Sequence, residues 1–259
     1  GLMVNKLINV YIGRKKLDDR DSYINKRIDL PGILLGQLFR QYYKKMINDI
    51  SRFFRKKNHD DEHPIIVINQ IKPNTIEQGI KTGLLTGLWG ASKSKKGVSQ
   101  VLQRYTFLQT ISYLRRIMSP SVDASTTKVT SIRHVHNVQY GYVCPVETPE
   151  GGKIGLIKNL AIMATVTHNM NTQIIIIKNL IDDLLIEISE IDPEMFHKLF
   201  KVFINGEWLG FVQNELDMYN LLKTNRTNGT INKYVSIILD IRHMELKILC
   251  DAGRITRPL

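Results

Sequence analysis

The chain has 259 residues, with 36 Lys and Arg side chains against 24 Asp and Glu, so its formal net charge is +12. Hydrophobic residues make up 43% of the sequence, which is enough to build packed cores and excludes general disorder. No uncharged apolar stretch is long enough to cross a membrane, and no secretory leader is visible. Cys144 and Cys250 fit neither a zinc motif nor a disulfide framework, which is typical of a reducing, intracellular compartment.

The positive charge is concentrated in the first two thirds of the chain. Residues 1–60 carry 14 basic and 6 acidic side chains, a net of +8, and residues 61–165 carry 12 and 6, a net of +6. Residues 166–259 carry 10 and 12, a net of −2. A cationic region favours a polyanion, most often the phosphates of nucleic acid. A solvated lysine-rich face kept for solubility is the alternative interpretation.

A long helix is expected to begin near Pro31, with Asp29 as a candidate cap, and to continue to residues 55–57. Its apolar positions recur at spacings of four and should share one face: Leu34, Leu38, Tyr42 and Met46. Residues 77–88 predict a second helix, in which glycines at positions 79, 83 and 87 form a stripe of small residues. Such a stripe allows a neighbouring helix or strand to come close.

The most regular helix is expected over residues 97–116, where the last turn holds two arginines and the helix dipole favours cations. Its apolar face would consist of Val101, Tyr105, Leu108, Ile111 and Leu114. Residues 118–132 are rich in Ser, Thr and Asp and predict a loop of about fifteen residues, a length typical of functional or mobile loops.

The second half of the chain predicts shorter elements. Residues 161–168 and 172–178 are expected to be strands, and residues 193–202 a short helix. Residues 203–210 predict a hairpin with an Asn-Gly turn. A helix over 216–224 and alternating strands over 235–239 and 245–249 complete a fold of the α+β class.

Isolated motif chemistry indicates no self-contained active site. His59 and His63 share the spacing of zinc ligands on a helix, but acidic residues separate them and Pro64 follows, so a solvated loop is the preferred interpretation. His134 and His136 are only two potential ligands, and a structural or nucleic-acid-facing role is preferred to a metal site. Phosphate-loop, dinucleotide-binding and nucleophile-elbow motifs are absent from the sequence.

An ordered series of longer motifs is far more specific. The sequence reads DDRD at 18–21, LLGQLF at 34–39, GVSQVLQR at 97–104, SYLRR at 112–116, RHVHN at 133–137, YGYVCPVETPEG at 140–151, GLIKNL at 155–160, and DAGR at 251–254 with RPL at 257–259. In this order the motifs resemble the second-largest subunit of multisubunit DNA-directed RNA polymerases, in the eukaryotic, archaeal and large-DNA-virus branch. The richness in Ile, Asn and Lys favours an AT-rich, viral genome. Both ends look internal to a longer protein.

The resemblance implies a mixed multidomain fragment. Residues 1–70 would be the helical C-terminal part of the protrusion, residues 71–165 the fork with two fork loops, and residues 166–259 a small α/β first external domain. The family makes RNA from nucleoside triphosphates on a DNA template with Mg²⁺, which the largest subunit mainly holds. The fragment alone is therefore expected to be inactive and to contain no catalytic residue and no metal site.

The resemblance also implies which residues lie near the active centre. Arg133 would approach the incoming nucleotide and the downstream template, with a structural ion pair as the alternative. Gln100 and Gln103 would lie near the RNA 3′ end, or be ordinary helix-surface residues. Glu147 and Glu150 belong to the ETPEG turn, where Glu150 is expected to order Arg133 or the Gln100 helix.

Two loops of the fork would meet nucleic acid. Residues 91–96 match the first fork loop, near the upstream hybrid, and residues 119–132 match the second, at the downstream edge of the bubble. The residues expected to contact nucleic acid are Lys93, Lys95, Lys96, Arg104, Arg115, Arg116, Lys128 and Arg133.

The expected partners are the DNA template, the RNA–DNA hybrid, nucleoside triphosphates, the largest subunit and other polymerase subunits, with no membrane. The location would be the nucleus, or the cytoplasm or virion for a viral protein. Two rival interpretations remain: a stand-alone nucleic-acid-binding module from a split or decayed polymerase gene, and a structural assembly piece without a nucleic-acid role.

Overall fold

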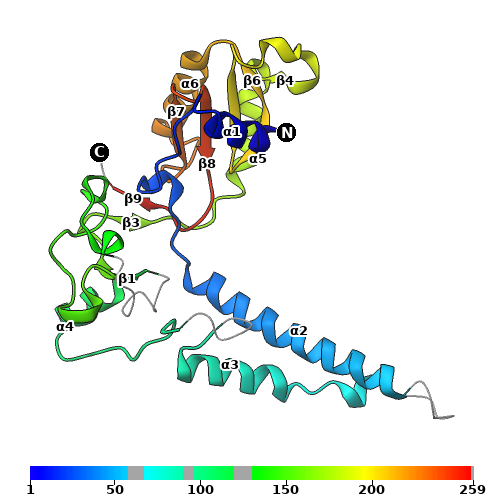
Figure 1. The fold of residues 1–259 in the computed structure, drawn as a ribbon, viewed down its shortest axis with the longest axis vertical. Helices are drawn as coiled ribbons and strands as arrows, with labels where there is room; N and C mark the ends of the chain where they lie inside the picture. The colour runs from blue at the N-terminus through cyan, green and yellow to red at the C-terminus, as the bar shows by residue number, and fades with distance from the viewer. Residues whose placement is uncertain (58–66, 90–95, 120–129, 258–259) are drawn as a thin grey trace. The chain divides into compact units, whose positions relative to one another are not determined.

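The computed structural model describes residues 1–57, 67–89, 96–119 and 130–257 (Figure 1). The chain divides into two compact units. Unit 1 combines Gly1–Ile28 with Met163–Leu259, and unit 2 is Asp29–Ile162. Helices and several sheets occur together, so the predicted α+β class is confirmed.

Unit 1 is built on a five-stranded sheet with the strand order β4-β6-β5-β8-β7. Strands β5 and β8 are parallel, and the other neighbours are antiparallel. The strands are β4 (Ile186–Glu187), β5 (Phe200–Ile204), β6 (Glu207–Val212), β7 (Ser236–Asp240) and β8 (Glu245–Leu249). The predicted Asn-Gly turn joins β5 to β6, where Asn205 and Gly206 both have positive φ, as a tight hairpin requires. A separate antiparallel pair consists of β3 (Thr165–Val166) and β9 (Ile255–Thr256).

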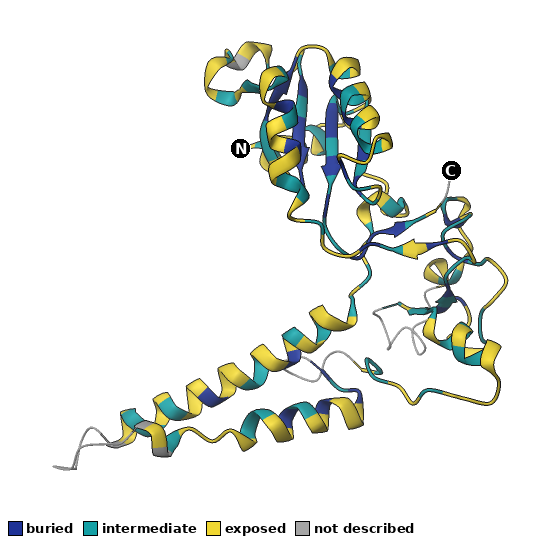
Figure 2. Cartoon of the chain, turned by 180° about the vertical axis from the view of Figure 1, so that it is seen from behind, coloured by how far each residue is buried: buried dark blue, intermediate teal, exposed yellow. Residues whose placement is uncertain are grey.

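Helices cover both faces of this sheet. On one face lie α5 (Gln173–Ile181) and α6 (Glu215–Thr227), which bury apolar side chains against the strands (Figure 2). The core residues contributed by the two helices and by β5 and β8 are Ile177, Ile181, Met218, Leu222, Val202, Ile204, Leu246 and Ile248. On the opposite face lies α1 (Leu2–Tyr11), where Lys6 pairs with the buried carboxylate of Glu245 on β8.

Unit 2 begins with a helical hairpin of α2 (Pro31–Lys57) and α3 (Asn74–Thr86). The predicted stripe of small residues is confirmed, since Gly79 packs on the ring of Tyr42 and Gly83 on the side chain of Leu38. This register makes the two helices antiparallel. Gly87 ends α3 in the left-handed conformation that glycine adopts without strain.

The rest of unit 2 contains little regular structure. Helix α4 spans Phe107–Leu114, and an antiparallel pair is formed by β1 (Arg116–Met118) and β2 (Ile157–Asn159). Short 3₁₀ helices complete both units: η1 (Tyr23–Asn25), η2 (Val67–Gln70), η4 (Ser131–Arg133), η5 (Asn137–Gln139), η6 (Gly151–Lys153), η7 (Asp182–Leu184), η8 (Ile188–Glu190) and η9 (Pro193–Met195).

Four sequence predictions are corrected by the structure. Residues 172–178 are not a strand, because their isoleucines belong to α5, whose burial against the sheet overrides β-branched propensity. The helix predicted over 97–116 is confined to α4, which begins where the Thr106 hydroxyl accepts a hydrogen bond from the Gln109 amide. Residues 193–202 divide between η9 and the start of β5, and only Thr165–Val166 is a strand within 161–168.

Throughout the four described ranges, no helix has both the length and the apolar character needed to cross a membrane.

Candidate nucleic-acid interface

The guanidinium group of Arg133 is held by backbone oxygens of the segment that follows the ETPEG sequence. Its Nη1 donates to the Gly152 carbonyl at 2.8 Å and to the Ile154 carbonyl at 2.9 Å. Arg133 ends η4 and is half-buried. These bonds fix the orientation of a side chain that is always positively charged.

Gly155 allows this approach. A Cβ atom at Gly155 would lie 2.7 Å from the Arg133 Cα, and the φ of Gly155 is +70°. Both facts require glycine at this position. The segment after the ETPEG turn therefore passes directly against the Arg133 backbone.

The ETPEG turn is closed by Thr148, a residue whose role the sequence analysis did not recognise. Its hydroxyl donates to the Ile157 carbonyl at 3.0 Å and accepts from the Gly155 amide at 3.0 Å. The available signal was a hydroxyl residue within a turn, where such side chains commonly bond nearby backbone.

Glu147 and Glu150 have different surroundings. The Glu147 carboxylate accepts a hydrogen bond from the Ser112 hydroxyl on α4, and the Glu147 backbone carbonyl accepts from the side-chain amide of Asn159 at 3.2 Å. Glu150 is exposed and directly precedes η6, the 3₁₀ turn whose Gly152 carbonyl holds Arg133. Glu147 thus ties the ETPEG turn to α4.

The two glutamines predicted near the RNA are bonded within unit 2. The Gln100 side-chain oxygen accepts from the Tyr113 hydroxyl at 2.9 Å, while its amide donates to the Gly97 carbonyl at 3.0 Å and to the Met118 sulfur. The Gln103 side-chain oxygen accepts from the side-chain amide of Gln109 at 3.2 Å. Both residues lie outside α4, so they are not on the helix surface that the sequence suggested.

Two of the predicted cationic contacts take part in the fold of unit 2. Arg115 donates to the carbonyls of Ala161 and Ile162. The Arg116 guanidinium lies 4.4 Å from the ring centroid of Tyr113, a cation–π arrangement. Its buried Nε and the Oδ1 of Asn159, the residue opposite it in the β1–β2 register, both have no hydrogen-bond partner.

The other lysines and arginines predicted to contact nucleic acid are either exposed or lie outside the described residues. Lys96 and Arg104 are exposed. Lys93, Lys95 and Lys128 lie outside the described residues, as do His59, His63 and most of the segment predicted to be the second fork loop.

Metal ions in proteins are commonly bound by clusters of His, Cys, Asp and Glu side chains. Across the described residues, no group of three or more His, Cys, Asp or Glu side chains is placed to hold a metal ion.

Three family models match the chain in order. They are described as RNA polymerase Rpb2, domain 2 (residues 1–29), domain 3 (residues 100–166) and domain 4 (residues 202–259), and together they cover more than half of the chain. The chain belongs to the family of second-largest RNA polymerase subunits. The domain 3 match contains Arg133, the ETPEG turn and both glutamines.

Relatives from viruses, eukaryotes and archaea match along the whole chain. DNA-directed RNA polymerase subunit 2 of Acanthamoeba polyphaga mimivirus is 46% identical over 99% of the chain and 22% of its own length. RNA polymerase II subunit RPB2 of Eremothecium gossypii is 39% identical over 100% of the chain and 21% of its own length. The archaeal subunit Rpo2 of Saccharolobus solfataricus is 32% identical over 99% of the chain and 23% of its own length. The chain thus spans about a fifth of these curated relatives.

Proposed function

We propose that the chain is a segment of the second-largest subunit of a DNA-directed RNA polymerase and takes part in template-dependent RNA synthesis from nucleoside triphosphates. The observation that carries this proposal is the ordered match to Rpb2 domains 2, 3 and 4 along one chain. The cationic character of residues 1–165 supports it independently, since the substrate, template and product are all polyanions.

Within this function, Arg133 is the residue proposed to act nearest the reacting groups. Its guanidinium is fixed by two carbonyls, so a charge that phosphate would favour is already oriented before any nucleotide arrives. Preorganised charge of this kind costs little reorganisation when substrate binds. Ser112, Glu147 and Thr148 are positioning residues, because their hydrogen bonds hold the ETPEG turn, and the segment that carries those carbonyls follows this turn directly.

The basic segment around the first fork loop is proposed to contact the RNA–DNA hybrid. Lys93, Lys95 and Lys96 are close in sequence and would meet phosphates as point charges. Arg104 and Lys128 are assigned to the same phosphate-contacting class. Arg115 and Arg116 would attract nucleic-acid phosphates through their positive charge, in addition to the contacts that they make within unit 2.

The assembly is proposed to include a larger subunit that mainly holds the catalytic Mg²⁺, together with other polymerase subunits. The assignment of residues 1–70 to the protrusion, 71–165 to the fork and 166–259 to the first external domain is part of the same proposal. The enzyme would act in the nucleus, or in the cytoplasm or virion if the source is a virus.

The rival function is a stand-alone nucleic-acid-binding module. The two proposed functions predict different masses and different bound partners for the native protein. These are measured after the protein is captured from its source with an antibody to residues 97–160. The polymerase proposal predicts a chain several times longer than 259 residues, bound to a larger partner, in a complex that makes RNA on a DNA template. A native chain near 29.8 kDa without a large partner would favour the binding module.

A further inference from the structure

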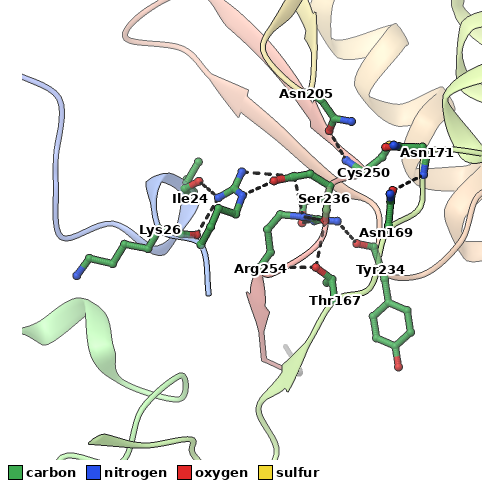
Figure 3. Close-up of polar contacts among 12 residues, drawn as sticks. Ile24, Lys26, Thr167, Asn169, Asn171, Asn205, Tyr234, Ser236, Cys250 and Arg254 are labelled. Carbon is green, nitrogen blue, oxygen red and sulfur yellow. Dashed lines mark hydrogen bonds and ion pairs between the residues drawn. The ribbon is translucent and has the colours of Figure 1, made fainter. Parts of the chain in front are cut away.

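The carboxylate of Asp251 connects two arginines that are far apart in the sequence, and one of them, Arg254, is labelled in Figure 3. Its Oδ2 accepts a hydrogen bond from Arg27 Nε, across a separation of 224 residues. Its Oδ1 lies 3.2 Å from Arg254 Nε. Asp251 and Arg254 belong to the DAGR motif, and Arg27 follows the DDRD motif, so one ion-pair network joins both ends of the motif series.

Arg254 is almost completely buried, with 4% of its side chain exposed. Its Nε donates to the Asp251 carbonyl at 3.0 Å, its Nη2 to the Tyr234 carbonyl at 3.0 Å, and its Nη1 to the Ser236 hydroxyl. Burial lowers the pKa of this guanidinium, and the nearby Asp251 carboxylate opposes that shift. Removing a partner from a buried charge of this kind is strongly destabilising.

The turn of the DAGR motif also contacts the N-terminal segment through its backbone. The Ile28 amide donates to the Gly253 carbonyl at 2.7 Å. Gly253 has a φ of +82°, and a Cβ atom there would collide with the Ile28 carbonyl oxygen. The close contact between residues 28 and 253 therefore requires glycine.

The same turn holds a third segment, next to β3. The Thr167 amide donates to the Arg254 carbonyl at 2.9 Å, and the Gly253 amide donates to the Thr167 carbonyl at 2.9 Å. The Thr167 hydroxyl accepts from the Arg254 amide at 3.1 Å and donates to the Asp251 carbonyl at 3.2 Å. Thr167 is fully buried.

The chain passes between the two units twice, after Ile28 and after Ile162. Ile28 and Thr167 lie close to these two crossings, and both bond to the turn at residues 251–254. We infer that Asp251, Gly253 and Arg254, with Arg27, form a clasp that anchors both connections at their unit 1 ends. The stability of the turn at residues 251–254 would therefore determine how strongly both connections are bonded to unit 1. The inference rests on unit 1 alone and does not depend on the polymerase proposal.

The test is hydrogen exchange with mass spectrometry on the full-length native protein, together with any partners that co-purify with it. Asp251→Ala removes the carboxylate shared by both arginines. Exchange in the segments 22–28 and 163–168 should rise at least about tenfold together, since charge-assisted hydrogen bonds contribute more than neutral ones. Asp183→Ala, a change at an exposed residue of the same unit, should leave both segments unchanged.

Two results would overturn the clasp: unchanged exchange in either segment of Asp251→Ala, or an equal rise in the Asp183→Ala control. If Asp251→Ala does not assemble, the clasp is tested with Arg27→Ala. This change leaves the contacts of the buried Arg254 in place. Faster exchange in residues 22–28 of Arg27→Ala would support the clasp, and unchanged exchange there would contradict it.

Discussion

The backbone of Arg133 lies directly against Gly155, so that a Cβ atom on Gly155 would lie 2.7 Å from the Arg133 Cα. Gly155→Ala should therefore displace Arg133 and destabilise unit 2 by about 1–3 kcal/mol, since both sterics and a positive φ oppose the change. The measurement is nucleotide-addition rate and complex stability in the whole polymerase. Gly152→Ala is the matched control, because a Cβ there meets nothing within 4 Å and its φ is not positive. Equal effects of the two changes would contradict the close-packing argument.

Arg133 itself gives the sharpest kinetic prediction. Arg133→Ala should slow nucleotide addition, most clearly at low nucleotide concentration, and leave subunit assembly intact. A neighbouring surface cation, Lys153, should tolerate the change to Ala because it is exposed and carries no assigned role. Single-turnover addition rates measure both variants. Unchanged rates for Arg133→Ala would remove its proposed role near the nucleotide.

Phosphate contacts proposed for residues 91–96, the proposed first fork loop, should be revealed by salt dependence. Changing Lys93, Lys95 and Lys96 together to Ala should weaken retention of the hybrid and reduce the slope of log affinity against log salt by about 0.7–0.9 per lost contact. A variant with the same charge change in the acidic third of the chain, Lys198, Lys223 and Lys233 to Ala, should keep the slope. If both variants shift the slope equally, the effect is overall charge and the loop assignment is wrong.

The helical hairpin of unit 2 should respond in opposite directions to two Gly→Ala changes. Gly79→Ala would place a methyl group inside the ring of Tyr42 and should destabilise the hairpin by about 1–3 kcal/mol. Gly36, on α2, has open space around it, so Gly36→Ala should stabilise by up to about 1 kcal/mol through helix propensity. Urea unfolding followed by circular dichroism compares them. A stabilising Gly79→Ala would contradict the observed packing.

The buried Glu245 of unit 1 predicts a loss of stability in acid. Burial alone would raise its pKa, but hydrogen bonds from Lys6 and Lys247 outweigh that effect and hold the pKa below its usual value. A carboxyl with a lowered folded pKa stabilises the fold above its unfolded pKa, about 4.3 for Glu, and this contribution is lost as pH falls through the folded pKa.

Glu245→Gln should therefore cost about 1–3 kcal/mol at pH 7, because Lys6 and Lys247 are only partly screened by solvent. It should also flatten the dependence of unfolding free energy on pH below 5. Exposed Glu190→Gln is the control and should change neither quantity. Denaturant unfolding between pH 7 and 3 measures both, and an unchanged acid dependence in Glu245→Gln would refute the assignment.

Local pattern predicted much of the fold but failed where packing decides. The four-residue apolar spacing predicted α2, and the glycine stripe predicted a close contact that α2 makes with α3. The Asn205-Gly206 pair predicted the hairpin of β5 and β6. The isoleucine run of α5 was misread as a strand, because its burial against the sheet comes from residues far along the chain. Residues 97–106 show the reverse error: an apolar period is present, but these residues form bends and irregular structure instead of a helix, and Val101 is 87% exposed.

The candidate site was predicted through motif resemblance, and its geometry was not. Arg133 and the ETPEG turn were singled out in the sequence, but nothing in the spacing indicated the carbonyls of Gly152 and Ile154 as partners. Thr148 was missed because a hydroxyl that bonds backbone leaves only a weak sequence signal. The pairing of Arg27 with Asp251 is non-local and becomes visible only in three dimensions.

The proposal that the segment around Arg133 lies at the active centre is tested most directly by photocrosslinking in the assembled polymerase. A photoreactive residue replaces Val135, which is 62% exposed and lies two positions from Arg133, in a halted elongation complex with labelled DNA, RNA and nucleotide. The same residue at Ile241, 72% exposed in the acidic third of the chain, is the control. Labelling of nucleic acid or nucleotide from position 135 and not from 241 is the predicted result. Absence of such labelling from position 135, or equal labelling from both positions, would contradict the placement of this segment at the active centre.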